Sequence, residues 1–130
     1  KFIKELSYTE IKKIVKYDFP YSFWEAIKSN IENIDDIDVW LDIIYNENFS
    51  NIKSIKDKKL LEVAQFSLPD EIDHNSWKKW TDLIKDKSGI KGKNLFMPLR
   101  IALTGLENGP EMKLVLPLMK REEIIRRLNK

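Results

Sequence analysis

Several residue types on which protein chemistry often depends are scarce in this sequence. Its 130 residues include no cysteine and a single histidine, His74. The first absence excludes disulfides, thiolate metal ligands and cysteine nucleophiles, and it favours a reducing compartment. The second excludes a histidine-based catalytic triad and any multi-histidine metal site. His74 lies in "EIDHNSW" without a partner motif, so we interpret it as a surface or capping residue.

Long hydrophobic runs and cofactor motifs are also missing. No apolar run approaches the ~20 residues that a membrane-spanning helix requires, and no signal-peptide pattern follows Lys1. The acidic run at residues 35–42 lacks the glycine and the terminal glutamate of an EF-hand loop. In "GIKGKN", residues 89–94, the glycines are too close together for a Walker A loop. We therefore predict a cytoplasmic protein without membrane contact, and a chain without a metal, cofactor or catalytic group of its own.

What the sequence does contain is helical periodicity along nearly its whole length. The pattern "SYTE" at residues 7–10 is typical of a helix capping box, and Asp18-Phe19-Pro20 is expected to end that helix. Apolar stripes predict four more helices: at Trp24, Ile27, Ile31 and Ile34; at Ile37, Trp40, Leu41 and Ile44, capped by Asp35; at Leu60, Leu61 and Ala64; and at Trp77, Trp80 and Ile84, ended by Gly89. No strand-like alternation persists, so we predict an all-α fold with all four tryptophans in its core.

A polar stretch near residues 46–57 predicts a boundary between two small, packed helical lobes. Loops of that length without structure of their own are uncommon inside a compact domain. We place the first lobe at residues 1–50 and the second at residues 51–130.

Charge is distributed unevenly along the chain. Residues 1–83 hold 12 Lys and Arg against 16 Asp and Glu, whereas residues 84–130 hold 11 against 5. A basic C-terminal part indicates contact with a polyanion on one side of the molecule. A solvated helical surface that merely happens to be uneven explains the same numbers equally well.

The segment "NLFMPLRIALTGLENGPEM", residues 94–112, is helical in pattern but interrupted. We predict a short helix with Pro98 in its first turn and Gly105 at its end, which directs Leu99 and Leu103 inward and Arg100 to another face. Asn108-Gly109-Pro110 is predicted to form a tight turn, with Pro110 opening the next helix. Arg100 beside a fixed turn could read planar hydrogen-bond acceptors such as unstacked bases. The residues alone favour a simpler interpretation, in which Arg100 is a helix-end residue paired with an acid such as Glu107.

Longer stretches carry a family resemblance. The string "KGKNLFMPLRIALTGLENGPEM", continued by "LPLMKREEIIRRL", closely resembles the C-terminal end of bacterial glutamyl-tRNA synthetases. The segments "FWEAIKSNIENIDDIDVWLDII" and "SWKKWTDLIK" are also similar to that family, so the resemblance runs from Phe19 to Leu128. It implies the all-α anticodon-binding domain of a class I aminoacyl-tRNA synthetase.

The resemblance also implies a larger protein around this chain. In that family the intact synthetase attaches glutamate to tRNA-Glu, with ATP and Mg²⁺ bound by a Rossmann domain that carries HIGH and KMSKS-type motifs. Those motifs are absent here and the sequence does not begin with Met, so we expect a fragment without ligase activity, monomeric and bound to tRNA but not to DNA.

The family's motifs also imply which individual residues contact the tRNA. The arginine of "PLR" contacts the anticodon and matches Arg100, and the turn after "LTG" implicates Asn108, Gly109 and Pro110. In "WEAIKSN", Lys28 stands where the family often has arginine. An amine cannot reproduce the two-pronged contact of a guanidinium, so we expect relaxed discrimination that admits tRNA-Gln. The cations expected to attract phosphates are Lys91, Lys93, Lys113, Lys120, Arg121, Arg126 and Arg127.

Two other classes of function stay open at this point. One is a non-catalytic, all-α protein-interaction module whose basic half meets an acidic partner. The other is a DNA-binding helix-turn-helix protein, which fits less well because "LRIALTG" offers only one basic residue for a recognition helix.

Overall fold

The protein is described by a computed structural model over residues 3–15, 17–50 and 56–129. In chain order the helices are η1 Ile3–Glu5, α1 Tyr8–Ile14, α2 Tyr21–Ile27, η2 Lys28–Asn30, α3 Asp35–Tyr45, α4 Lys58–Ser67, α5 Ser76–Ser88, α6 Lys93–Thr104, α7 Met112–Val115, η3 Leu116–Leu118 and α8 Arg121–Leu128, where η marks a short 3-10 helix. Within these described ranges there is no strand, and the all-α prediction is confirmed.

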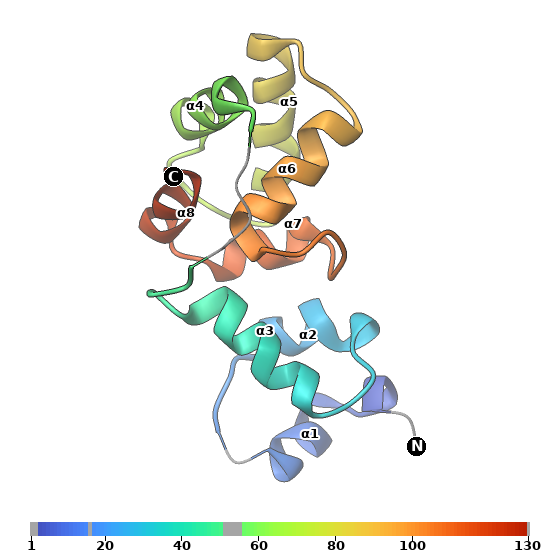
Figure 1. The fold of residues 1–130 in the computed structure, drawn as a ribbon. Helices are drawn as coiled ribbons and strands as arrows, with labels where there is room; N and C mark the ends of the chain where they lie inside the picture. Colours follow the sequence, from blue (N-terminus) through green and yellow to red (C-terminus); the bar gives the residue numbers. More distant parts are fainter. Residues whose placement is uncertain (1–2, 16, 51–55, 130) are drawn as a thin grey trace.

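The helices form two groups. Figure 1 shows α1, α2 and α3 together in its lower half and α4, α5, α6 and α8 in its upper half, with α7 at the junction. Helices α2 and α7 are in contact across that junction. Residues 51–55, in the middle of the stretch 46–57 where we placed the boundary between lobes, lie outside the described residues, so the division into 1–50 and 51–130 stays a prediction.

Local sequence signals explain where most helices begin and end. Ser7 and Glu10 form the predicted capping box at the start of α1, each side chain binding the backbone N–H of the other. Asp57 caps α4 by accepting from the N–H of Leu60. Helices α5 and α6 end at Gly89 and Gly105 with φ of 78° and 77°, a left-handed conformation that glycine adopts without a Cβ clash.

The second and third helices differ in detail from the prediction. Helix α2 begins at Tyr21 and passes into η2, so Ile34 falls outside it and is exposed. Asp35 lies inside α3 and is not its N-cap. The side chain of Asp36 instead accepts from the N–H groups of Glu32 and Asn33. On α3 the buried stripe includes Ile43, whereas Leu41 is only partly buried.

Helix α6 is longer than predicted. It begins at Lys93, so Pro98 lies inside the helix rather than in its first turn. Pro98 has no N–H for the carbonyl of Asn94, but Asn94 is exposed and water can take that place. Arg100 therefore projects from a continuous 12-residue helix. Pro110 is buried and does not open the next helix, because α7 starts at Met112.

One apolar core extends through both groups of helices. Trp24, Trp40 and Trp80 are buried in it, as predicted, and the indole N–H of Trp80 donates to the carbonyl of Ala64 at 2.8 Å. Trp77 is only partly buried and packs against the edge of the core. Part of the Trp77 side chain is therefore accessible to solvent.

Arg127 joins the two groups and is only 1% exposed. Its Nη1 donates to the carbonyls of Ile43 on α3 (2.5 Å) and Leu103 on α6 (2.8 Å), and its Nε donates to Glu123 (2.9 Å). Its guanidinium also lies over the ring of Phe49, 4.4 Å from the centroid. Our assignment of Arg127 as a phosphate-attracting residue was wrong, because its charge is used inside the protein.

Glu123 is held between Arg126 and Arg127. Burial by itself would raise the pKa of Glu123, but hydrogen bonds from Arg126 and Arg127 outweigh it and lower the pKa. A lowered pKa means that this carboxylate stabilises the fold above its unfolded pKa of about 4.3, and that the stabilisation is lost as pH falls through the folded pKa.

We therefore expect Glu123→Gln to be less stable than the unmodified chain at neutral pH, by about 1–3 kcal/mol, and to lose less further stability on acidification below pH ~4. Urea unfolding at a series of pH values measures both effects. The neighbouring Glu122→Gln is the control, since Glu122 is exposed. Equal acid dependence in the unmodified chain and in Glu123→Gln would contradict this account.

Candidate nucleic-acid interface

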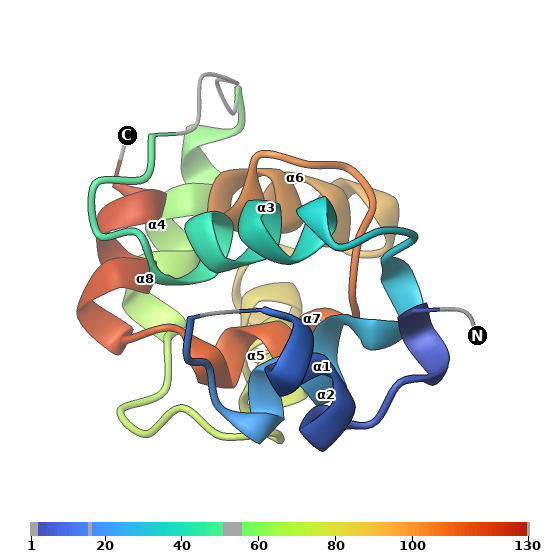
Figure 2. The same ribbon diagram turned by 90° about the horizontal axis from the view of Figure 1, so that it is seen from below.

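The loop at residues 106–110 lies between the two groups of helices and contacts both (Figures 1 and 2). From the lower group, the Asn30 side-chain amide donates to the carbonyl of Gly109 at 3.3 Å. From the upper group, Arg100 Nη1 donates to the carbonyl of Pro110 at 3.0 Å. The start of the loop is fixed by Thr104, whose hydroxyl accepts from the N–H of Leu106 at 3.1 Å and donates to the carbonyl of Arg100 at 2.8 Å. No backbone–backbone hydrogen bond closes residues 106–110 into the predicted tight turn, so contacts with side chains hold this loop.

Gly109 is packed so closely that a side chain does not fit. A Cβ at this position would lie 2.6 and 2.8 Å from two ring carbons of Trp40, and 3.3 Å from Arg100 Nη1. Contacts below 3.0 Å require a neighbour to move, and the Trp40 ring is itself buried. The absence of a side chain therefore sets the distance between this loop and α3.

Arg100 is partly buried, and its guanidinium is held through one nitrogen, Nη1. Burial lowers the pKa of its guanidinium, which nevertheless stays protonated in any folded protein. Arg100 forms no ion pair with Glu107, so the simpler interpretation of the sequence was wrong. Apart from the Nη1 contact, the structure gives the guanidinium no hydrogen-bond partner among the described residues. Nε and Nη2 are left to donate to a planar acceptor.

A pocket of about 300 Å³ lies beside Arg100. It is lined by Trp77, Phe96, Arg100, Glu111, Met112 and Lys113. Phe96 and Arg100 share one face of α6 because they are four residues apart. The pocket thus combines an aromatic wall with one arginine, one lysine and one carboxylate.

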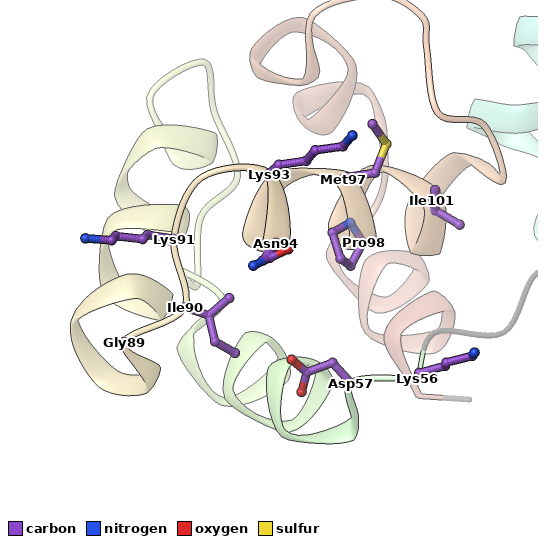
Figure 3. Close-up of a pocket in the computed structure, with 10 residues that line it drawn as sticks. All are labelled: Lys56, Asp57, Gly89, Ile90, Lys91, Lys93, Asn94, Met97, Pro98 and Ile101. Atoms are coloured by element: carbon purple, nitrogen blue, oxygen red, sulfur yellow. The ribbon is translucent and has the colours of Figure 1, made fainter.

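A second, larger pocket of about 760 Å³ lies along a different face of α6. Figure 3 shows Asn94 and Pro98 of α6 facing Asp57 and Ile90 across it, with Lys56 and Lys93 around its edge and Lys91 directed away. Lys91 and Lys93 are exposed. Both line this pocket and not the one beside Arg100.

Comparison with known proteins identifies the family. The family model for "Anticodon binding domain" matches residues 2–130. The chain belongs to this family. Glutamate–tRNA ligase 1 of Rickettsia prowazekii is 44% identical over 98% of the chain, and glutamate–tRNA ligase 2 of Bartonella henselae is 38% identical over 98%. Glutamate–tRNA ligase 2 of Ehrlichia canis is 39% identical over 99%.

The chain spans 29–30% of the length of these relatives. It is homologous to the C-terminal anticodon-binding region of glutamate–tRNA ligases, which confirms the resemblance predicted from the sequence.

The anticodon-binding domain brings some of the predicted contact residues together and separates others. Arg100, Gly109 and Pro110 meet at the 106–110 loop, and Asn108 is exposed on it. Pro110 is buried, so its ring is not accessible for contact. Its carbonyl instead accepts the hydrogen bond that holds Arg100. Lys28 instead pairs with Glu25 at 3.1 Å.

Sequence reasoning missed several residues of this surface. Asn30, which reaches the loop, is the last residue of the "WEAIKSN" motif, but Lys28 was the only residue of that motif that we predicted to contact tRNA. Trp77 was assigned wholly to the core, and Phe96 was not considered. The signal that could have found Phe96 is its spacing of four residues from Arg100.

The remaining predicted cations also differ in availability. Lys113 is exposed and only loosely paired with Glu111, at 4.0 Å. Lys120 pairs with Glu47 at 3.1 Å, an exposed contact that contributes little. Arg121 donates to the carbonyls of Leu68 and Pro69, and Arg126 to Glu123 and the carbonyl of Phe49. Lys91, Lys93 and Lys113 are thus the least engaged of the set.

Two structural features are absent from the described residues of the domain. No group of three or more His, Cys, Asp or Glu side chains in those residues could hold a metal ion. None of the helices there is both long and apolar enough to cross a membrane.

Proposed function

We propose that this domain binds the anticodon loop of tRNA-Glu and that Arg100 reads the edge of one of its bases. The observation that carries this proposal is the state of the Arg100 guanidinium: Nη1 is fixed to Pro110, while Nε and Nη2 have no partner among the described residues. A pre-oriented guanidinium loses little freedom on binding and matches planar acceptors with two parallel hydrogen bonds.

The chemistry of RNA assigns different roles to the base-contacting and the phosphate-contacting residues of this proposal. Anticodon loops are single-stranded, so their bases can leave the stack and expose their Watson–Crick edges. Arg100 and exposed Asn108 supply contacts to base edges, and Gly109 and Pro110 hold the loop that supports them. Lys91, Lys93, Lys113 and Lys120 attract phosphates, which adds affinity but no sequence preference. Lys28 is a weaker base contact in this proposal, because Glu25 competes for its ammonium.

For the whole protein we propose the activity named for its relatives. A ligase of that kind would join glutamate to tRNA-Glu, with ATP and Mg²⁺ bound outside this domain, in the cytoplasm and as a monomer. Because Lys28 stands where the family often has arginine, we further propose that tRNA-Gln is also accepted. Charging assays on the whole ligase with each tRNA test that last point.

A titration with anticodon stem-loops tests the role of this chain. The 130-residue chain is titrated at one fixed salt concentration with stem-loops that carry a glutamate, a glutamine or an unrelated anticodon. We expect tighter binding of the glutamate loop than of the unrelated loop, and a loss of about 1–3 kcal/mol with that preference erased in Arg100→Ala and Arg100→Lys. Lys113→Ala is the matched control, because loss of a phosphate contact should weaken all three loops alike.

Two results would contradict the proposal. One is equal binding of all three loops by the unmodified chain, which would leave phosphate attraction alone. The other is an anticodon preference that survives both Arg100 variants. A protein-interaction module, the competing function, would bind an acidic partner with no preference among anticodons.

A further inference from the structure

The wall of the 300 Å³ pocket beside Arg100 is aromatic and partly exposed. Phe96 is 46% exposed although it is a large apolar residue on a regular helix. Its ring lies 6.3 Å from that of Trp77, with 38° between the two planes. An exposed aromatic ring at the side of a pocket with polar walls is typical of a binding surface.

This aromatic wall is rigid. Trp77 packs edge-on against Trp80, with ring centroids 5.8 Å apart, and Trp80 is fully buried and hydrogen-bonded to Ala64. Met112 closes the pocket from α7 and is also buried. The orientation of Phe96 is therefore supported from behind by residues of the core.

The polar groups around the same pocket match the parts of a nucleotide. Arg100 can donate to acceptors on a base edge, and the Glu111 carboxylate can accept from an exocyclic amino group. Lys113, exposed and 4.0 Å from Glu111, can meet a phosphate. An aromatic face adds stacking, which any base can use. An acidic peptide would pair with Arg100 and Lys113 but would gain nothing from stacking on the ring of Phe96.

We propose that Phe96, supported by Trp77, is the stacking platform for one unstacked base of the RNA loop, with Arg100 at the edge of that base. This inference rests on the proposed function and adds a residue to it. Phe96 touches the base, whereas Trp77 positions Phe96.

Photocrosslinking locates the stacked base directly. Stem-loops with the glutamate anticodon carry 5-iodouridine at one loop position at a time, are bound to the unmodified 130-residue chain and are irradiated. Halogenated pyrimidines crosslink preferentially to an aromatic ring stacked on them. We expect one loop position to crosslink to the tryptic peptide 94–100, which contains Phe96 and Arg100 and no other aromatic residue. This result does not depend on the folding of any variant.

Affinity measurements with matched variants complete the test. Phe96→Leu keeps an apolar side chain but not the ring, and we expect binding about 5- to 150-fold weaker, whereas Phe96→Tyr should bind like the unmodified chain. Phe66→Leu is the control, because Phe66 is 84% exposed on α4 and does not line the pocket. Circular dichroism verifies that each variant is folded.

The outcomes separate this inference from the proposed function. If the chain prefers the glutamate loop, but no crosslink falls in residues 94–100 and Phe96→Leu binds normally, the stacking platform is refuted and anticodon recognition stands. If the chain shows no preference among anticodons, the proposed function is refuted, whereas the stacking platform is refuted only if no crosslink falls in residues 94–100 and Phe96→Leu binds normally.

Discussion

Arg127→Met is expected to lower the free energy of unfolding by about 3–5 kcal/mol, the cost typical of breaking a buried ionic network by removing one partner. Methionine fills much of the same space but donates no hydrogen bond. The carbonyls of Ile43 and Leu103 would lose their donor, and so would that of Asn46, which Arg127 Nη2 reaches at 3.2 Å. These carbonyls belong to the C-terminal ends of α3 and α6, where the helix dipole concentrates negative charge.

Urea unfolding of two neighbouring variants separates this network from a general effect of arginine. Arg126→Met is the comparison, because Arg126 is exposed and shares Glu123 with Arg127 but donates to neither Ile43 nor Leu103, and we expect a smaller loss than for Arg127→Met. In Arg127→Met the buried carboxylate of Glu123 has lost one of its partners. The double variant Glu123→Leu with Arg127→Met removes that carboxylate as well, so it should recover part of the lost stability. An Arg127→Met protein as stable as Arg126→Met would contradict the role of Arg127 as the link between the two groups of helices.

The example of Arg127 shows what the sequence could have predicted. In "REEIIRRL" we interpreted three arginines as surface charges. Ile124, Arg127 and Leu128 nevertheless share one face of α8, and Glu123 lies four residues before Arg127. That spacing indicates a charged pair on an apolar stripe. The carbonyls that accept from Nη1 and Nη2 are more than 20 residues away in the chain, so no local pattern could reveal them.

Helix α6 illustrates a conflict between two valid local rules. Proline is favoured in the first turn of a helix, which predicted a start near Pro98. Apolar positions at helical spacing, however, begin at Leu95, which is buried together with Leu99, Ala102 and Leu103. Burial of that stripe outweighs the one hydrogen bond that Pro98 removes. Arg100 was correctly placed on a different face of this helix from Leu99 and Leu103, but no sequence pattern indicated that its hydrogen-bond partner is the carbonyl of Pro110.

The assembly of the candidate site was the least predictable feature. The family resemblance indicated Arg100 and the residues that follow Gly105, and the structure brings Arg100, Gly109 and Pro110 together. The hydrogen bond from Asn30 to the carbonyl of Gly109 spans 79 residues of sequence. Such a contact depends on how the two groups of helices pack, which helical periodicity does not specify.

Gly109→Ala is the second substitution for which we expect a large effect. The added Cβ would meet the buried ring of Trp40 at 2.6 and 2.8 Å, so either the 106–110 loop or α3 must move. Overpacking of this kind costs about 1–3 kcal/mol of stability. Movement of the loop would also displace the Pro110 carbonyl, which holds Arg100. We therefore expect weaker binding of the glutamate stem-loop, with a reduced preference over an unrelated anticodon.

A compensating variant distinguishes this steric cause from a loss of glycine flexibility. Trp40→Leu removes the two ring carbons that the new Cβ would meet. The double variant Gly109→Ala with Trp40→Leu should therefore bind the stem-loop better than Gly109→Ala alone, even though loss of the indole lowers stability by itself. If the two changes instead add without compensation, the space beside Trp40 is not what holds the loop. Two residues in contact are expected to show a coupling free energy, which is the difference between the effect of the double variant and the sum of the single effects. We would measure this coupling both for stem-loop binding and for urea unfolding. Its sign tests whether the packing of α3 against Gly109 fixes the position of Arg100.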